Sequence, residues 1–373
     1  MHQVLQPVRE EMAAAMSQLA FPDRAQEAWR YVNTDLLKRA VAFKTGSANP
    51  PLELPVHPGL SLQGLEKLPA GEAAQMLKII KQQASGDYFA ALNLSCVEEV
   101  QVLKVARGAI MDEAFDLKLA PVAHQRLHVH VGAGARARIN IGQVVPMLPA
   151  LITCETTFHL EANAILELAV QKSSGHAESV LLTGYGFVQQ RDSSVKFVHV
   201  ASGQGLTRMR AHSDLRGENA GIELIGGADL SGTSALHTFM EVHHTVPHCR
   251  SRQLFKNILR DAARSSFDGT IFVEKHAQKT VAEQLNNNLL LSAEARAATK
   301  PRLNIHADDV ICTHGATVGQ LDEDEVFYLQ ARGLPPQRAR SLLAYGFLRE
   351  IVQEIPFAAV RESWDRELAG VYK

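Results

Sequence analysis

The sequence predicts a mainly β protein, a β-solenoid with helices before and after it, from two observations. Short runs in which apolar and polar residues alternate, such as RLHVHV and VKFVHV, fill the region from about residue 94 to residue 315. This period of two is typical of strands that bury one face. Three similar segments, GAGARARI, EANAILEL and GENAGIEL, begin at positions 132, 161 and 217, so the second spacing is close to twice the first. Such a regular spacing indicates stacked coils, although a β-sandwich is the alternative fold for many short strands.

The first 95 or so residues are expected to be helical, with proline-rich joints. In REEMAAAMSQLAF the apolar residues recur at helical spacing, and Pro22 ends the segment. Residues 23–43 are expected to continue as helix, with Asp23 as the N-cap. The stretch NPPLELPVHPG, residues 49–59, is predicted to be a stiff linker because each proline disfavours helix at the residue before it.

The chain is expected to return to helix after the solenoid. Asp322 and Glu325 form a capping arrangement for a helix that ends at Gly333. Pro335 and Pro336 then open a second helix, whose predicted apolar stripe is Leu342, Leu343, Gly346, Phe347, Ile351 and Ile355. The predicted domains are a helical region with a proline-rich linker, a β-solenoid core and a C-terminal helical domain: residues 1–95, 96–318 and 319–373.

Composition excludes several classes of protein. The chain has 373 residues, of which 46% are hydrophobic and 21% charged, and its net charge is −2, which is typical of a soluble globular protein. This charge gives no general attraction to nucleic acid or to an anionic membrane. We find no run of about 18 apolar residues and no signal-peptide pattern, so a cytoplasmic protein without a membrane segment is expected.

Several familiar site motifs are missing from the sequence. The four cysteines are scattered without a CxxC pair, which argues against a zinc ribbon, a ferredoxin-like cluster or a disulfide framework. No phosphate-binding GxxxxGK[ST] loop and no GxSxG elbow occurs. The sequence therefore does not predict an ATPase or a serine hydrolase of that type.

Two histidine-containing stretches are expected to be structural. His128 and His130 share one face of a strand but have no visible third partner, so a surface pair is expected. In the stretch from His237 to Cys249, the neighbours His243 and His244 point to opposite faces and cannot both hold one ion. These histidines are therefore predicted to be strand and turn residues without a metal.

The adjacent acids Asp308 and Asp309 carry the alternative function. Solenoid enzymes that cleave polysaccharides need carboxylates that converge on one bond of the substrate. Neighbouring residues on one strand diverge, so a turn or edge role is expected for both acids. A β-solenoid enzyme that acts on polysaccharide through Asp308 or Asp309 is nevertheless the competing hypothesis.

Cys312 and His314 form a different pattern. They are two residues apart and so face the same way on a strand, and small residues follow at Gly315 and Ala316. Thiolate and imidazole are good ligands for iron or zinc. The spacing alone favours a buried thiol beside a turn histidine.

Long stretches of the sequence resemble a known family. KPRLNIHADDVICTHGATVGQLDEDEVFYLQARGL, residues 300–334, is similar to the C-terminal signature of the SufD family, scaffold subunits of the SUF iron–sulfur cluster assembly system. Residues 244–273 and the stretch NNNLLLS at residues 286–292 also match, as does WRYVNTD near the start. The resemblance covers nearly the whole chain.

This resemblance implies a fold and a function. It implies a right-handed parallel β-helix and a scaffold subunit that is not itself an enzyme. The implied partners are the sister scaffold SufB, paired edge to edge, and the ABC-type ATPase SufC, docked on the C-terminal helices; a homodimer is expected when the subunit is isolated. In SufB a cysteine used for cluster assembly lies in the region matched here by NNNLLLS, which indicates SufD rather than SufB.

The resemblance also implies particular site residues. His314 matches the histidine of the family's HGAT motif, which lies where SufB and SufD meet and would contact the nascent iron–sulfur cluster, or iron, transiently. Cys312 is a candidate neighbour in that site. No permanent cofactor is expected in the isolated subunit. The expected SufC-binding residues on the C-terminal helices are Arg338, Arg340, Leu343, Phe347 and Arg349.

Overall fold

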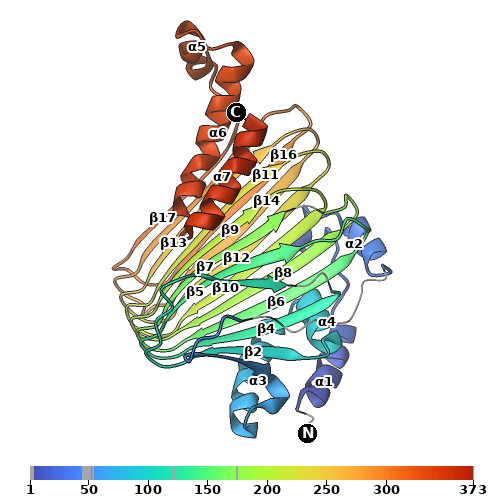
Figure 1. Ribbon diagram of the computed structural model, residues 1–373, viewed down its shortest axis with the longest axis vertical. Coiled ribbons are helices and arrows are strands. Elements are labelled where there is room, and N and C mark those ends of the chain that lie inside the picture. Colours follow the sequence, from blue (N-terminus) through green and yellow to red (C-terminus); the bar gives the residue numbers. More distant parts are fainter. Residues whose placement is uncertain (1–3, 44–51, 53, 120–121, 174, 373) are drawn as a thin grey trace.

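The computed structural model describes residues 4–43, 52, 54–119, 122–173 and 175–372, which form a parallel β-helix between two groups of helices (Figure 1). The linker predicted over residues 49–59 lies partly outside the described residues. Among the described residues, no helix combines the length and the hydropathy that crossing a bilayer requires. The mainly β prediction, with helices at both ends, is confirmed.

The strands form two sheets, and the chain alternates between them so that two successive strands make one coil. Sheet A contains, in spatial order, β1 (Leu60–Gly64), β2 (Val100–Val105), β4 (His124–Val131), β6 (Leu151–Leu160), β8 (Val180–Gln189), β10 (Leu206–Leu215), β12 (Ala235–His244), β14 (Arg264–Val273) and β16 (Arg296–Ile305). Sheet B contains, from the other end, β17 (Ile311–Gly319), β15 (Val281–Leu290), β13 (Arg250–Leu259), β11 (Gly221–Leu230), β9 (Ser194–Ala201), β7 (Ile165–Ser173), β5 (Arg136–Val144) and β3 (Phe115–Leu119).

The register of the strands confirms the predicted repeat. Arg136 pairs with Ile165, Ile165 with Ser194, and Ser194 with Gly221, so each coil has nearly the same length. Neighbouring strands are parallel except for β1, which runs antiparallel to β2, so the fold is a solenoid and not a sandwich. One corner of successive coils carries a residue with φ between 58° and 65°: Gly134, Asn163, Asp192, Asn219, His248 and Lys279. Glycine, asparagine and aspartate adopt this left-handed conformation most readily.

The interior of the β-helix is an apolar stack. Each coil contributes inward-facing side chains that lie on those of the coil before it. Phe158 and Phe187, paired in register on β6 and β8, stack with centroids 5.1 Å apart and planes 9° apart. Phe197 from sheet B meets Phe187 edge to face. Such aromatic pairs add stabilisation beyond the buried area.

The N-terminal helices lie on the outer face of sheet A, away from this interior. They are α1 (Leu5–Gln18), α2 (Thr34–Ala40), α3 (Ala70–Ala84) and α4 (Tyr88–Cys96). The single helix predicted for residues 23–43 is wrong, because Asn33 caps a short helix that starts at Thr34. Asp23 instead accepts hydrogen bonds from the backbone of Ala25 and Gln26 in a turn.

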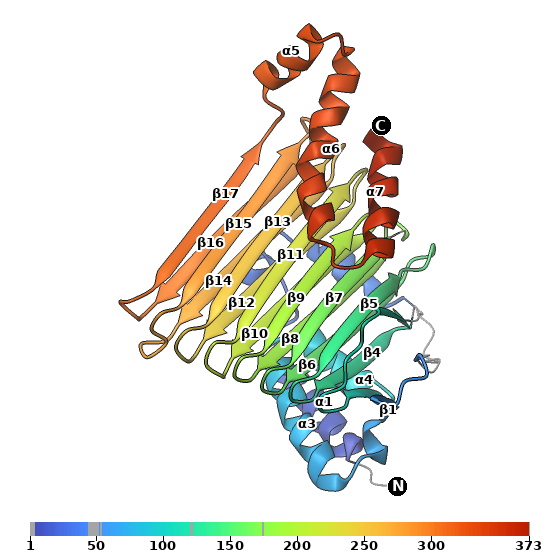
Figure 2. The same ribbon diagram turned by 60° about the vertical axis from the view of Figure 1, so that its left-hand side comes forward.

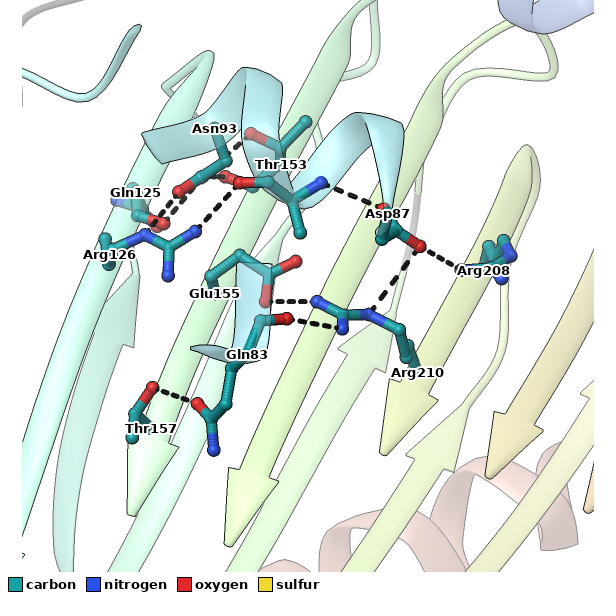
Figure 3. A network of polar contacts seen from close by, with 11 residues as sticks. Gln83, Asp87, Asn93, Gln125, Arg126, Thr153, Glu155, Thr157, Arg208 and Arg210 are labelled. Carbon is teal, nitrogen blue, oxygen red and sulfur yellow. Dashed lines mark hydrogen bonds and ion pairs between the residues drawn. The ribbon is translucent and has the colours of Figure 1, made fainter. Parts of the chain in front are cut away.

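A buried polar network holds α3 and α4 against sheet A (Figure 3). Arg210 donates to Glu155 at 2.9 Å, and its Nε lies 3.8 Å from Asp87, the N-cap of α4. Burial alone would raise the pKa of Asp87, but the charges of Arg210 and Arg208 outweigh it and hold the pKa below its usual value. The labelled network consists of Gln83, Asp87, Asn93, Gln125, Arg126, Thr153, Glu155, Thr157, Arg208 and Arg210.

The C-terminal helices are α5 (Glu323–Ala331), α6 (Pro336–Glu354) and α7 (Ala358–Tyr372). The predicted boundaries are confirmed: Asp322 accepts from the backbone of Asp324, Gly333 has a φ of +90°, and Pro336 is the first residue of α6. Helices α6 and α7 cover the outer face of sheet B, while α5 projects beyond the sheet (Figure 2).

The predicted apolar stripe of α6 is only partly correct. Ile351 and Ile355 are buried, but so are Leu348 and Val352, whereas Leu342 is 38% exposed. The buried side packs on sheet B and α7, and these two neighbours determine which apolar residues of α6 are covered.

Candidate functional site

The last coil of the β-helix is open. Strands β16 and β17 end their sheets, so each is hydrogen-bonded to a neighbouring strand on one side only. The side chains of Ile311 and Val318 on β17 are 67% and 44% exposed. Unpaired strand edges and uncovered apolar side chains favour pairing with another chain.

Cys312 and His314 lie on this open strand and face the same way, as predicted. In the register, Cys312 lies beside Ala282 and His314 beside Gln284, both of which are buried. His314 is exposed because no coil covers it. Cys312 is half-buried against a small apolar cluster, and this burial raises the pKa of its thiol, so the thiol is protonated at neutral pH.

The interior just behind these two residues is polar, which the sequence analysis missed. Gln284 donates to Gln253 at 2.8 Å, and Asn288 donates to Asn286 at 2.8 Å. Asn257 in turn donates to Asn288 at 3.0 Å. The repeated asparagines in NNNLLLS were a visible signal, because strands rarely contain asparagine unless its amide is bonded.

His314 and Cys312 do not form a complete metal site within this chain. Among the described residues, two groups bring three ligand atoms of His, Cys, Asp or Glu within 4.8 Å of one another, and neither contains Cys312 or His314. The open strand therefore presents one exposed imidazole and one half-buried thiol, without a third such ligand beside them among the described residues.

The two groups lie instead on the outer face of sheet A. One is His128, His130 and His159, and the other is His212, Glu241 and His243. The expected surface pair of His128 and His130 is wrong, because His128 is fully buried and His159 lies beside His130 on the next strand.

The residues predicted to bind SufC are spread over α6. Leu343 and Phe347 line a groove of about 520 Å³ between α6 and the end of β17. Arg340 forms two hydrogen bonds, of 2.8 and 2.7 Å, with the carboxylate of Glu323. Arg349 is exposed. At 3.6 residues per turn, Arg338 and Arg349 fall together on the side of α6 opposite to Leu343 and Phe347. On α5, the exposed aromatic residues Phe327 and Tyr328 were not singled out from the sequence.

The acids of the alternative hypothesis are in a turn between β16 and β17. Asp308 accepts a hydrogen bond from Gln278 at 2.8 Å, and Asp309 forms an ion pair with Lys279. These contacts account for both carboxylates, which hold the corner of the coil to the coil before it.

Comparison with known proteins agrees with this architecture. Residues 116–347 match the family model described as "SUF system FeS cluster assembly, SufBD core domain". The chain is 34% identical over 241 residues to the iron–sulfur cluster assembly protein SufD of Escherichia coli and 37% identical over 204 residues to a SufBD family protein of Synechocystis. These alignments cover 62% and 54% of this chain, and 55% and 45% of the relatives' own lengths.

A third relative aligns over a longer range. Protein ABCI7 from the chloroplast of Arabidopsis thaliana is 25% identical over 418 residues, which covers 98% of this chain and 86% of the relative. The family model covers more than half of the chain, including β16, β17 and α5. The chain therefore belongs to the SufBD family of SUF-system iron–sulfur cluster assembly proteins and is of the SufD type.

Proposed function

We propose that this chain is a non-catalytic scaffold subunit that pairs through its open coil with SufB. The nascent iron–sulfur cluster, which is the cargo of the assembly, would be built at the seam between the two subunits. The observation that carries this proposal is the exposed imidazole of His314 on an edge strand that has no neighbour on its outer side. A second β-helix docked there would continue the sheets by strand addition.

The chemistry of His314 suits such a shared site. An imidazole nitrogen is a good ligand for iron. Cys312 is two residues away on the same face, but its raised pKa and half-buried position make it the weaker ligand. His314 is therefore the residue through which this chain would touch iron, and Cys312 would mainly pack the end of the coil.

The second part of the proposal concerns the ATPase. SufC would dock on α5 and α6, because they carry an apolar groove with Leu343 and Phe347 and the exposed aromatic residues Phe327 and Tyr328. Interfaces concentrate their energy in such aromatic, apolar and arginine side chains. Nucleotide binding by SufC would then change the relative position of the two scaffold subunits. A partner can shift such a conformational equilibrium only if it binds one of the two arrangements more tightly than the other.

The test is His314→Ala in a complex reconstituted with SufB and SufC. We expect assembly to be unaffected and the unfolding free energy to change by less than about 0.5 kcal/mol, as is usual for an exposed side chain. The iron and sulfide content of the complex should nevertheless fall to background. The matched control is His276→Ala, an exposed turn histidine one coil earlier, which should retain full cluster content. Full loading of the His314→Ala complex would remove this residue from the function.

A further inference from the structure

Three histidines that the proposed function does not use lie together on the outer face of sheet A. His128 and His130 are two residues apart on β4 and point to the same face. The register of β4 and β6 places His159 directly beside His130, and their ring centroids are 5.1 Å apart. One ligand nitrogen from each of the three rings lies within 4.8 Å of the other two.

His128 is buried without a hydrogen-bond partner. Its exposure is 0%, and neither Nδ1 nor Nε2 has a partner among the described residues. Its neighbour in the register, Thr157, donates to Gln83 of α3 at 2.6 Å, so that helix covers this part of the sheet (Figure 3). A buried ring nitrogen without a partner is costly, so the lone pair of His128 is available for a ligand that the described residues do not supply.

A carboxylate orients the second histidine. The Nε2 of His130 is hydrogen-bonded to Glu161 Oε1 at 3.0 Å, and the other carboxylate oxygen accepts from the backbone N–H of Ala133 at 2.8 Å. If Nε2 carries the proton, Nδ1 of His130 retains a lone pair for an ion. Histidine ligands of metals are commonly held by a carboxylate in this way.

Two of the three rings have lowered pKa values. Burial lowers the pKa of His128 to about 3, and burial also lowers the pKa of His159. The cations that act on these rings are Lys104 and Arg216, and Lys104 is paired with Glu72 at 2.5 Å. Neutral imidazoles are the form that binds metal.

We propose that His128, His130 and His159 bind one divalent transition-metal ion of the Zn²⁺ or Fe²⁺ class, with Glu161 positioning His130. Imidazole nitrogens suit these ions. Tetrahedral ligands at the usual Zn–N distance of about 2.0–2.1 Å lie about 3.4 Å apart, so ligand nitrogens that lie within 4.8 Å of one another would approach by at most about 1.4 Å on binding. The partly exposed side of His130 leaves room for a fourth ligand such as water.

The second group on this sheet, His212, Glu241 and His243, is a less suitable metal site because His212 already has partners. His212 lies between Asp214 and Glu241, at 3.0 and 3.5 Å. Burial would lower the pKa of His212, but its hydrogen bonds to these carboxylates raise it to about 9. His212 is therefore protonated at neutral pH and already partnered, so this group is an ion-pair cluster and not a vacant set of ligands.

The test uses the full chain, freed of metal by chelation and titrated with Co²⁺ at neutral pH. Co²⁺ replaces Zn²⁺ at such sites, and its visible d–d absorption reports coordination by nitrogen. We expect one saturable Co²⁺ per chain, displaced by Zn²⁺, and a higher unfolding midpoint in the presence of metal. His159→Ala should lower the Co²⁺ affinity by at least about 100-fold, and Glu161→Gln by about tenfold.

Two further variants separate a metal site from a merely structural cluster. His128→Leu should abolish Co²⁺ binding while leaving the metal-free unfolding midpoint no lower than that of the unmodified chain, since it removes an unpartnered polar ring. His243→Ala, in the ion-pair cluster on the same sheet, should leave the Co²⁺ affinity unchanged. Absence of saturable binding, or a loss caused by His243→Ala and not by His159→Ala, would overturn the proposal. Either result leaves the role of His314 untouched.

Discussion

At the scale of single residues, His212 makes the stability of the protein depend on pH. Its pKa in the folded chain is raised to about 9 by Asp214 and Glu241, against an ordinary value of 6.5. The folded state therefore holds this proton more tightly than the unfolded state does. The stabilisation is fully present below about pH 6.5 and is lost as the pH rises through about 9.

We expect the free energy of unfolding to decline between about pH 6.5 and pH 9, by on the order of 1–3 kcal/mol from this residue. His212→Gln should remove that part of the decline, because glutamine cannot carry the charge. Urea denaturation at several pH values measures the effect, with His276→Gln as the exposed control. Parallel curves for His212→Gln and the unmodified chain would show that His212 is not the titrating group.

The histidine cluster shows what the sequence could have revealed. Alternation predicted correctly that His128 and His130 share a face, but their third partner was missed. His159 follows His130 by one full coil of the repeat. His243 follows Asp214 by the same interval. Comparing polar residues that are one coil apart in the sequence would have found these neighbours. The burial of His128 could not be found in this way, because it depends on how α3 packs on sheet A.

At the scale of secondary-structure elements, β17 is the strand through which we propose that the chain pairs with SufB. Ile311→Lys places a charge on its exposed side, and charges are a common way to block edge-to-edge association. We expect this variant to fold normally and to lose binding to SufB, as measured by co-elution of the purified subunits. If the isolated chain forms a homodimer through the same edge, light scattering should show that Ile311→Lys is a monomer.

The matched control is Val281→Lys. Val281 lies beside Ile311 in the register, on the previous coil, and is 40% exposed. The Val281→Lys variant places the same charge on β15, which already has a neighbouring strand on both sides, so binding to SufB should be retained. Equal loss of SufB binding in both variants would show that the effect comes from charge in general and not from the edge.

Elements differed in how well the sequence predicted them. The ends of α5 and the start of α6 depend on Asp322, Gly333 and Pro336, which act locally, and the predictions there were correct. The buried side of α6 was predicted less well, because sheet B and α7 determine it. Helix α2 is short because Asn33, and not Asp23, provides the cap, and both residues are suitable caps by type.

At the scale of the whole molecule, the groove that contains Leu343 and Phe347 adjoins the end of β17, so the proposed SufC surface lies next to the open coil. Leu343 belongs to α6 and not to β17, which makes a further prediction: Leu343→Ala should weaken SufC binding by about tenfold or more, as truncation of a central interface residue does, and should weaken SufB binding less. Calorimetry with each partner measures both affinities. Arg366→Ala on α7, also exposed, is the control and should bind SufC normally. Unchanged SufC affinity in Leu343→Ala would place the ATPase elsewhere.

The antiparallel strand β1 has a consequence for how many copies can join. At that end of the molecule Leu60 and Leu62 pack against the first coils, and β1 offers an edge of only 5 residues that runs opposite to the other strands. Strand β3, which ends sheet B there, has 5 residues against 9 in β17, so it is a poorer template. A contact between two β17 strands would use the same edge of both chains. No β17 edge would then remain for a third chain, so such a contact would not extend head to tail into a filament. A solenoid with short strands at one end and long strands at the other is therefore expected to associate in pairs and not in filaments.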